Sequence, residues 1–520
     1  MAHDERTVNK PKTFGELKQN GYQPRSVRDE LRSNLRQALA RGENPFAGIH
    51  GYDRTVLPAL HNAILSRHDL LLLGLRGQAK TRLLRMLVNL LDPAIPALAG
   101  SELNEDPFHP ITKYGKRLLG EKGDAAPIVW IPRDERYREK LATPDVTIAD
   151  LIGDIDPIKA ATERRSYSDE EVIHYGIVPR TNRGIFAINE LPDLQPRIQV
   201  GLLNILEERD LQIRGFPVRI PLDILLVFSA NPEDYTNRGN IITPLKDRIS
   251  SQILTHYPDD VRIAARITAQ EAWLEREEQP RVEIPDFFRE LVEEIAFAAR
   301  SSEFVDQSSG VSARMPISAV EILASNLERR GLKHGERRVF PRLCDLPATL
   351  PAITGKVEMV YEGEQQGAEV VAKKLIGAAV RKAFDAKFPA PDSGRPTQRR
   401  REDMEEGAEE GPSGRRFRTP PEKLHPLYET IVEWFGAGNK VVLSDDSPFA
   451  EHLASLEAVP GLRKAVEEHF SPATAEERAV GMELVLEGLT QHLKIAREDL
   501  DSRVSYAEML KFNLVKSRTN

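Results

Sequence analysis

The sequence predicts an α/β fold, and three observations lead to this prediction. Short apolar runs at 70–73, 184–189 and 224–230 have the length and composition of strands buried on both faces of a parallel sheet. Stretches with the apolar spacing of helices alternate with these runs, as in βαβ units. A glycine-containing loop follows the first run and opens directly into a helix. The predicted architecture is a parallel sheet flanked by helices.

The first half of the chain is predicted to contain further helices, a loop-rich stretch and a hairpin around these apolar runs. Ser26 precedes an i, i+4 stripe of apolar residues that predicts a helix of about four turns. A second helix is expected at 54–66, directly before the first strand. Residues 92–127 are rich in loops, with a short strand at 128–131. Residues 208–221 alternate about Gly215 as a hairpin does.

The second half is predicted to be helical, with one interruption. Helices are expected at 259–276, 285–301, 314–331 and 365–386, and again beyond 425. Residues 388–424 hold prolines and charged runs with almost no apolar side chains, which is typical of a disordered linker. We therefore expect five segments: a tail and helix at 1–42, an α/β core at 43–257, a helical subdomain at 258–387, a linker at 388–424 and a separate C-terminal helical domain at 425–520.

Composition excludes several classes of protein. The chain has 520 residues, which is too long for a single hydrophobic core, so more than one domain is expected. Its net charge is −8 and 40% of its residues are hydrophobic, so no nucleic-acid or membrane partner is expected. The single cysteine, Cys344, fits a reducing compartment, and no apolar run approaches the ~18 residues of a membrane span. We expect a cytoplasmic protein. The histidines are scattered and none lies close to the cysteine in sequence, so no structural zinc site is expected.

A phosphate-binding loop is predicted directly after the first strand. It comprises Gly74, Leu75, Arg76, Gly77, Gln78, Ala79, Lys80 and Thr81. These residues match G-x-x-x-x-G-K-[ST] except at Ala79, where alanine fits if its φ stays negative. Loop N–H groups and the start of the helix would hold phosphates, Lys80 would reach the β- and γ-phosphates, and the Thr81 hydroxyl would bind Mg²⁺.

A second group of residues is expected beside this loop. Asn189 and Glu190 end a buried strand, where a metal-binding acid and an acid that orients water are usual. Glu190 has the expected type, whereas Asn189 carries no charge and could slow hydrolysis while leaving ATP binding intact. Asn231 ends the next strand and is placed to hydrogen-bond the γ-phosphate or the attacking water.

The chain resembles AAA+ ATPases of the magnesium-chelatase I-subunit/MoxR group. The matching pieces, in family order, are FAGIHGYDRTV, LLGLRGQAKTRLL, LATPDVTIADLIGDID, GIVPRTNRGIFAINELPDL, LLNILEERDLQIRG, FSANPEDY and LKDRIS. The resemblance implies an AAA+ P-loop domain with a helical lid. It makes residues 74–81 the Walker A loop, Asn189-Glu190 Walker B and Asn231 sensor 1.

The resemblance also implies further residues, cofactors and partners. Arg248 would be the arginine finger donated to a neighbouring subunit, Arg314 would be sensor 2, and Ile49 would line the adenine pocket. The hairpin at 208–221 resembles the helix-2 insert of this clade. The implied cofactors are ATP and Mg²⁺. The implied assembly is a homo-oligomeric ring, usually a hexamer in such families, that acts on a separate protein with a von Willebrand A-type domain.

Two functions remain open at this point. The first is a ring-forming ATPase that remodels a protein partner or loads it with metal. The second is an ATP-binding assembly or scaffold protein with weak hydrolysis, for which Asn189 is the main support. Insertion of Mg²⁺ into a porphyrin ranks lower, because the linker and the C-terminal region are extra to a plain I subunit. The sequence also lacks the GAFTGA-type loop of enhancer-dependent transcription activators.

Overall fold

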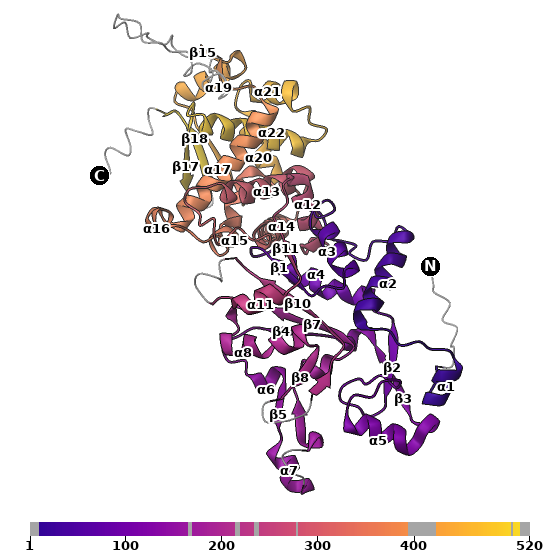
Figure 1. The fold of residues 1–520 in the computed structure, drawn as a ribbon. Coiled ribbons are helices and arrows are strands. Elements are labelled where there is room, and N and C mark those ends of the chain that lie inside the picture. Colours follow the sequence, from indigo (N-terminus) through magenta and orange to yellow (C-terminus); the bar gives the residue numbers. More distant parts are fainter. Residues whose placement is uncertain are drawn as a thin grey trace, which may run out of the picture. The chain divides into compact units, whose positions relative to one another are not determined.

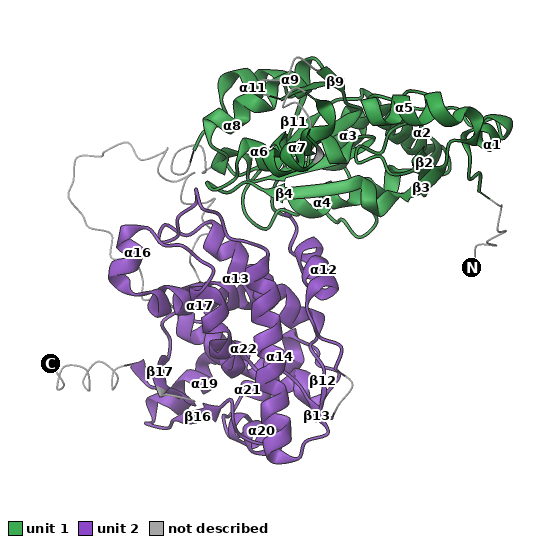
Figure 2. Cartoon of the chain, turned by 90° about the horizontal axis from the view of Figure 1, so that it is seen from below, with its two compact units in different colours: residues 1–257 green, residues 258–520 purple. Residues whose placement is uncertain are grey.

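The computed structural model describes residues 10–164, 169–213, 219–232, 239–276, 279–393, 423–500 and 503–509 (Figure 1). The chain forms two compact units, residues 1–257 and 258–520, which Figure 2 colours separately. Within the described ranges, no helix combines the length and apolar character that a membrane span requires.

A five-stranded parallel sheet forms the centre of the first unit. Its order is β11-β1-β10-β7-β4, with bounds Ser251–Leu254, Leu70–Leu73, Ile224–Ala230, Gly184–Asn189 and Tyr137–Leu141. Every residue of β1, β7 and β10 is buried, as the apolar runs predicted. The parallel sheet flanked by helices confirms the predicted fold class. The two edge strands, β4 and β11, were not predicted.

Helices cover both faces of this sheet. One face packs against α2 (Val27–Ala40), α3 (Val56–Leu65) and α4 (Lys80–Met86) through a cluster that includes Leu70 and Leu72. The other face packs against α8 (Pro196–Gly201), α9 (Leu203–Glu207) and α11 (Thr243–Arg248) through a cluster that includes Leu71 and Leu73. Alternate residues of β1 therefore face opposite helical layers, which is why the whole strand is apolar.

Smaller elements complete the first unit. The remaining helices are α1 (Phe14–Gln19), α5 (Lys113–Lys122), α6 (Ile148–Leu151) and α7 (Pro157–Glu163). Three antiparallel pairs join β2 (Ala94–Leu98) to β3 (Ile128–Pro132), β5 (Gly153–Ile155) to β6 (Ile173–Tyr175), and β8 (Asp210–Gln212) to β9 (Arg219–Pro221). The last pair is the predicted hairpin, whose tip at 214–218 lies outside the described residues.

The second unit is mainly helical. Its helices are α12 (Val261–Glu271), α13 (Asp286–Arg300), α14 (Arg314–His334), α15 (Leu350–Thr354), α16 (Tyr361–Gln366), α17 (Ala368–Lys387), α19 (Pro426–Gly436), α20 (Phe449–Glu457), α21 (Leu462–His469) and α22 (Ala475–Gln491). A three-stranded antiparallel sheet, β16 (Val441–Ser444), β18 (Arg503–Ala507) and β17 (Ala496–Leu500), accompanies them. Short pairs join β12 (Arg281–Val282) to β13 (Arg338–Val339) and β14 (Asp392–Ser393) to β15 (Lys423–Leu424).

The packing of the second unit differs from the predicted domain division. The sequence suggested a lid at 258–387 and a separate helical domain at 425–520. In the structure one hydrophobic cluster joins α13, α14 and α17 to α19, α21 and α22. Phe384 of α17, for example, would collide with any Cβ placed on Gly488 of α22, because the distance is 2.2 Å. The two stretches share a core, and the predicted linker falls largely on 394–422, outside the described residues.

Candidate nucleotide-binding site

The loop between β1 and α4 requires glycine at its first position. Gly74 donates its N–H to the carbonyl of Ala230, at the end of β10, over 3.2 Å. A Cβ on Gly74 would lie 1.9 Å from the Thr255 hydroxyl oxygen and 2.2 Å from the side-chain oxygen of Gln78. Both distances are far inside van der Waals contact, so a side chain at this position would displace the loop. Gly77 is also specific to the loop, because its φ is +74°.

Lys80 begins α4 and lies across the loop. Its ammonium donates hydrogen bonds to the carbonyl oxygens of Gly74 and Leu75, the second at 3.0 Å. The residue is only 8% exposed. An ammonium that is removed from water needs negative partners, and phosphate oxygens are stronger partners than carbonyl groups. The side chain is therefore suited to bind an anion that enters the loop.

The backbone at Ala79 corrects one expectation. From the sequence, alanine was expected to fit at this position on the condition that φ stays negative, but Ala79 has a φ of +56° and a ψ of 17°. This is the left-handed region, which favours glycine because it has no Cβ. The loop thus has the backbone conformation that glycine favours, and the Cβ of Ala79 makes that conformation strained.

Asn189 meets the start of α4 at the end of β7. The Thr81 hydroxyl donates to the Asn189 side-chain oxygen at 3.5 Å, and the Ser229 hydroxyl donates to the same oxygen at 3.1 Å. The structure therefore brings together the two residues that were predicted to bind metal. Both supply neutral oxygen atoms, which Mg²⁺ accepts when phosphate oxygens carry the negative charge. The residues present fit a nucleotide that is bound together with Mg²⁺.

Glu190 follows Asn189 and is half-buried. Its φ is +55°, and its N–H donates to the Ser229 hydroxyl at 3.3 Å. Left-handed backbone at a residue other than glycine is uncommon and often marks a functional site. Asn231 is buried at the end of the neighbouring strand, β10. Both residues thus lie at the carboxyl edge of the sheet, where α/β proteins bind ligands.

The other predicted site residues have different surroundings. Ile49 is buried in the cluster beneath α3 and α4. Arg248 ends α11 and donates to the Glu207 carboxylate at 2.7 Å. Arg314 is exposed at the start of α14, in the second unit, so the first unit does not itself supply it.

Three residues that the sequence did not single out hold the loop in place. The Tyr52 hydroxyl donates to the carbonyl oxygens of Gln78 and His256, each at 2.9 Å. Burial raises the pKa of Tyr52 to about 12, so the hydroxyl stays protonated and keeps donating. Thr255 donates to the Gln78 side-chain oxygen at 2.7 Å, and the Tyr257 hydroxyl donates to the carbonyl of Arg76 at 2.8 Å. Tyr52 lies in the matching piece FAGIHGYDRTV, whereas Thr255 and Tyr257 follow β11, whose sequence SQIL has no apolar run to mark it as a strand.

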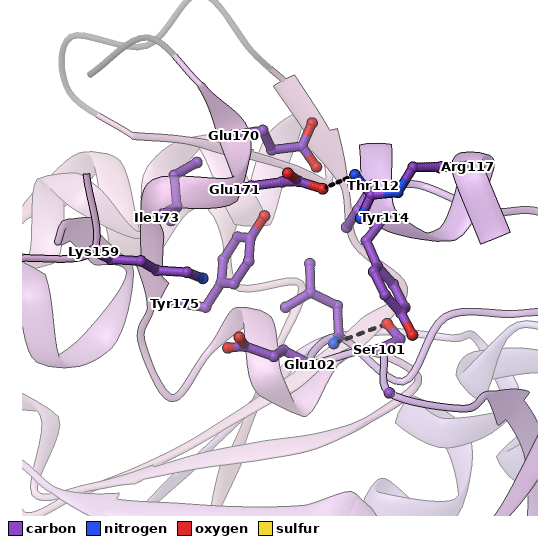
Figure 3. A pocket seen from close by; sticks show the side chains of 12 residues that line it. Ser101, Glu102, Thr112, Tyr114, Arg117, Lys159, Glu170, Glu171, Ile173 and Tyr175 are labelled. Atoms are coloured by element: carbon purple, nitrogen blue, oxygen red, sulfur yellow. Dashed lines mark hydrogen bonds and ion pairs between the residues drawn. The ribbon is translucent and has the colours of Figure 1, made fainter. Parts of the chain in front are cut away.

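A separate cavity lies in the first unit and contains no residue of the loop. It has a volume of about 240 Å³ and is lined by residues of 100–117 and 159–175, among them Tyr114 and Tyr175 (Figure 3). Arg117 pairs with Glu171 at 2.6 Å, and the Tyr114 hydroxyl donates to the carbonyl of Ala99 at 2.8 Å. Because these groups already have partners within the chain, the cavity is not assigned to nucleotide binding.

Comparison with known protein families supports the fold of the first unit. Residues 129–249 match the family model described as AAA domain (dynein-related subfamily). The matched segment contains β7, β10 and α11, with Asn189, Glu190, Asn231 and Arg248, and it begins after the phosphate-binding loop. The first unit has the AAA+ α/β fold.

Several solved structures share a low similarity with the chain. The complex between the magnesium chelatase subunits BchI and BchD is 18% identical, covers 62% of this chain and 98% of that chain, and has a TM-score of 0.32. NtrX of Brucella abortus with ADP is 14% identical over 71% of this chain and 66% of that chain, with a TM-score of 0.33. RuvB of Thermotoga maritima is 13% identical, covers 64% of this chain and 73% of that chain, and has a TM-score of 0.30. The chain spans about half to two thirds of the NtrX chains that it matches. Similarity at this level carries no argument about function.

Proposed function

We propose that the protein is an AAA+ ATPase that binds ATP with Mg²⁺ and forms a ring in which ATP hydrolysis drives the remodelling or metal loading of a protein partner. One observation carries the proposal. The parallel sheet brings the P-loop and the ends of β7 and β10 to one edge, where Thr81 contacts Asn189. Two segments that are more than a hundred residues apart thereby form one polar site at the end of a buried strand.

Each residue of this site has a proposed task. The bound nucleotide supplies the phosphoanhydride that is cleaved, and Mg²⁺ screens the charge of its phosphates. Lys80 exchanges the carbonyls of Gly74 and Leu75 for phosphate oxygens, and Thr81 with Asn189 positions the metal through neutral oxygens. Glu190 orients the attacking water, and Asn231 holds that water or the γ-phosphate.

Completion of the site by another subunit is part of the proposal. Arg248 would be the residue that a neighbouring subunit contributes, and Arg314 would serve as sensor 2, as the family resemblance implies. The resemblance to the chelatase I-subunit/MoxR group supports a ring, usually a hexamer, with a separate von Willebrand A-type protein as partner. The single cysteine, which fits a reducing compartment, supports action in the cytoplasm.

The geometry at Asn189 favours a second candidate function, an ATP-binding scaffold with slow turnover. An amide oxygen can accept hydrogen bonds from the Thr81 and Ser229 hydroxyls, but it adds no negative charge next to the metal. ATP would then bind and stabilise the assembly without rapid hydrolysis.

ATPase rates of three variants of the full chain distinguish these functions. The comparison is wild type against Asn189→Asp, Glu190→Gln and, as a matched control, Glu139→Gln on the edge strand β4. A wild-type rate that Glu190→Gln abolishes, and that Glu139→Gln leaves unchanged, supports the motor. A rate that rises many-fold in Asn189→Asp supports the scaffold. Absence of ATP binding in wild type contradicts both.

A further inference from the structure

Three side chains that commonly bind metals meet in the interior of the second unit. Cys344 lies in a 3₁₀ helix at Leu343–Thr349, His452 lies in α20 and Glu483 lies in α22. They are 6%, 1% and 0% exposed, and one ligand atom of each lies within 4.8 Å of those of the other two. The His452 Nε2 and Glu483 Oε1 atoms are 3.6 Å apart.

His452 is the residue that requires an explanation. Both of its ring nitrogens are buried, and neither has a hydrogen-bond partner among the described residues. Burial, with Arg342 and Arg330 nearby, lowers its pKa to about 2, so the ring is neutral. A neutral imidazole is the form that binds a metal. Leaving both nitrogens without a partner costs free energy that a bound cation would recover in part.

Glu483 is already oriented toward the cluster. Its carboxylate accepts the N–H of Leu343 at 2.6 Å and the N–H of Cys344 at 3.3 Å. These bonds fix the carboxylate at the start of the 3₁₀ helix that carries the thiol, as outer contacts commonly fix a metal ligand. A bound divalent cation would favour the deprotonated carboxylate and thiolate, which are the forms that bind metal.

The charges around the cluster balance when a divalent cation is present. Arg330 pairs with Asp345 at 2.6 Å, and Arg342 donates to the carbonyl of Ser447 at 2.9 Å. Asp445 adds a further half-buried carboxylate, and its backbone carbonyl accepts a bond from Arg330. The two arginines and the two aspartates balance each other, so the two charges of a divalent cation would be met by the carboxylate of Glu483 and the thiolate of Cys344.

We propose that Cys344, His452 and Glu483 bind one zinc ion in the second unit. Sulfur, imidazole nitrogen and carboxylate oxygen are the donor types that zinc accepts, at about 2.0–2.3 Å. Tetrahedral geometry at these bond lengths separates donor atoms by about 3.5 Å, close to the 3.6 Å between His452 and Glu483. The remaining pairs lie within 4.8 Å, so each needs to approach by no more than about 1.3 Å to reach this separation, and a water molecule would take the fourth position.

The site would join the two parts of the second unit. Cys344 precedes the stretch at 394–422, whereas His452 and Glu483 follow it. A zinc ion shared by all three would tie the C-terminal helices to the helices before this stretch. The expectation of no zinc site rested on sequence spacing alone, and these three residues are too far apart in the chain for spacing to reveal them.

The test measures zinc in the full-length protein after dialysis against trace zinc. Wild type is expected to retain one zinc per chain. Cys344→Ser and His452→Gln are expected to lower the affinity about tenfold or more. His469→Gln, at an exposed position of α21, is the matched control and should retain wild-type zinc.

Cobalt binding gives a second measurement, which uses the wild-type protein and so does not depend on whether a variant folds. The chain has a single cysteine, so a thiolate-to-cobalt charge-transfer band in wild type can arise only from Cys344. We expect this band to appear on cobalt addition and to be displaced by zinc. The proposal is overturned if wild type retains no zinc and shows no such band, or if Cys344→Ser binds zinc as tightly as wild type.

Discussion

Thr255 donates a hydrogen bond of 2.7 Å from its hydroxyl to the side-chain oxygen of Gln78. This bond joins the residue that follows β11 to the middle of the P-loop, and both side-chain oxygens lie over Gly74. The backbone N–H of Thr255 also donates to the carbonyl of Leu73 at 2.8 Å. The loop is therefore held by the neighbouring strand before any ligand binds, which lowers the entropy cost of binding.

Replacement of Gly74 by alanine should disrupt this arrangement. The new Cβ would lie 1.9 Å from the Thr255 oxygen, so the loop has to move away from β11. We expect ATP affinity to fall at least about tenfold, a loss of roughly 1.4 kcal/mol of binding free energy. Equilibrium binding of a fluorescent ATP analogue measures this. Gly120→Ala in α5 is the control, because no atom lies within 4 Å of the place that its Cβ would take, and equal effects of the two changes would contradict the argument.

Replacement of Ala79 by glycine should stabilise the first unit. A left-handed backbone costs a residue with a Cβ about 1 kcal/mol, and glycine avoids that cost. The φ of +56° at Ala79 therefore predicts a higher melting temperature for Ala79→Gly. Ala59→Gly in α3 is the matched control and should lower the melting temperature, since glycine weakens a helix by about 1 kcal/mol. A decrease in both variants would show that residue 79 is not left-handed in solution.

If Arg248 acts in the site of a neighbouring subunit, a mixture of two inactive variants should recover ATPase activity. Arg248→Ala should lower the ATPase rate by roughly 10³-fold if the guanidinium stabilises the transferred phosphoryl group in a neighbouring subunit. Lys80→Ala should abolish hydrolysis in its own site and leave its arginine intact. A mixture of the two should then hydrolyse ATP faster than either alone. If the mixture is no faster, Arg248 acts within its own subunit or only through its pair with Glu207.

Glu293 should make the second unit less stable as pH rises. Burial raises its pKa to about 7, although the Thr268 hydroxyl donates to its carboxylate. Between its unfolded pKa of about 4.3 and this value, the folded state binds more protons than the unfolded state. The stabilisation is therefore present at low pH and is lost as pH rises from about 4.3 through about 7, by up to about 4 kcal/mol in total.

Thermal unfolding between pH 5 and pH 8 measures this dependence. Glu293→Gln should flatten the decline, because glutamine can still accept the Thr268 hydrogen bond and does not titrate. Glu294→Gln is the matched control on the same helix, since Glu294 pairs with Lys382 at 2.7 Å. If the decline persists in Glu293→Gln and disappears in Glu294→Gln, the titrating group is Glu294 and not Glu293, which would contradict the prediction.

The sequence predicted the centre of the fold because that centre is apolar on both faces. The runs at 70–73, 184–189 and 224–230 became β1, β7 and β10, and the polar residues that end them lie at one edge. The edge strand β4 was missed because YREKL lacks an apolar run, and all of its residues are half-buried or exposed. An edge strand has one neighbour only, so its sequence is less constrained.

Other features depend on contacts that no local pattern encodes. The φ of Ala79 follows from the geometry of the loop and not from the preference of alanine. Tyr52 and Thr255 reach the P-loop from segments that are distant in sequence. The shared core of the second unit could not be predicted either, because helical spacing shows which face of a helix is apolar and not which helix covers it.

Binding of ATP with Mg²⁺ to wild type, Lys80→Ala and Lys116→Ala is the measurement that tests the central claim most directly. Lys116 is an exposed lysine of α5, so its replacement controls for loss of a charge from the first unit. We predict that wild type and Lys116→Ala bind equally well and that Lys80→Ala loses at least about tenfold in affinity. Equal binding by all three proteins, or no binding by wild type, would contradict a nucleotide site at the end of β1.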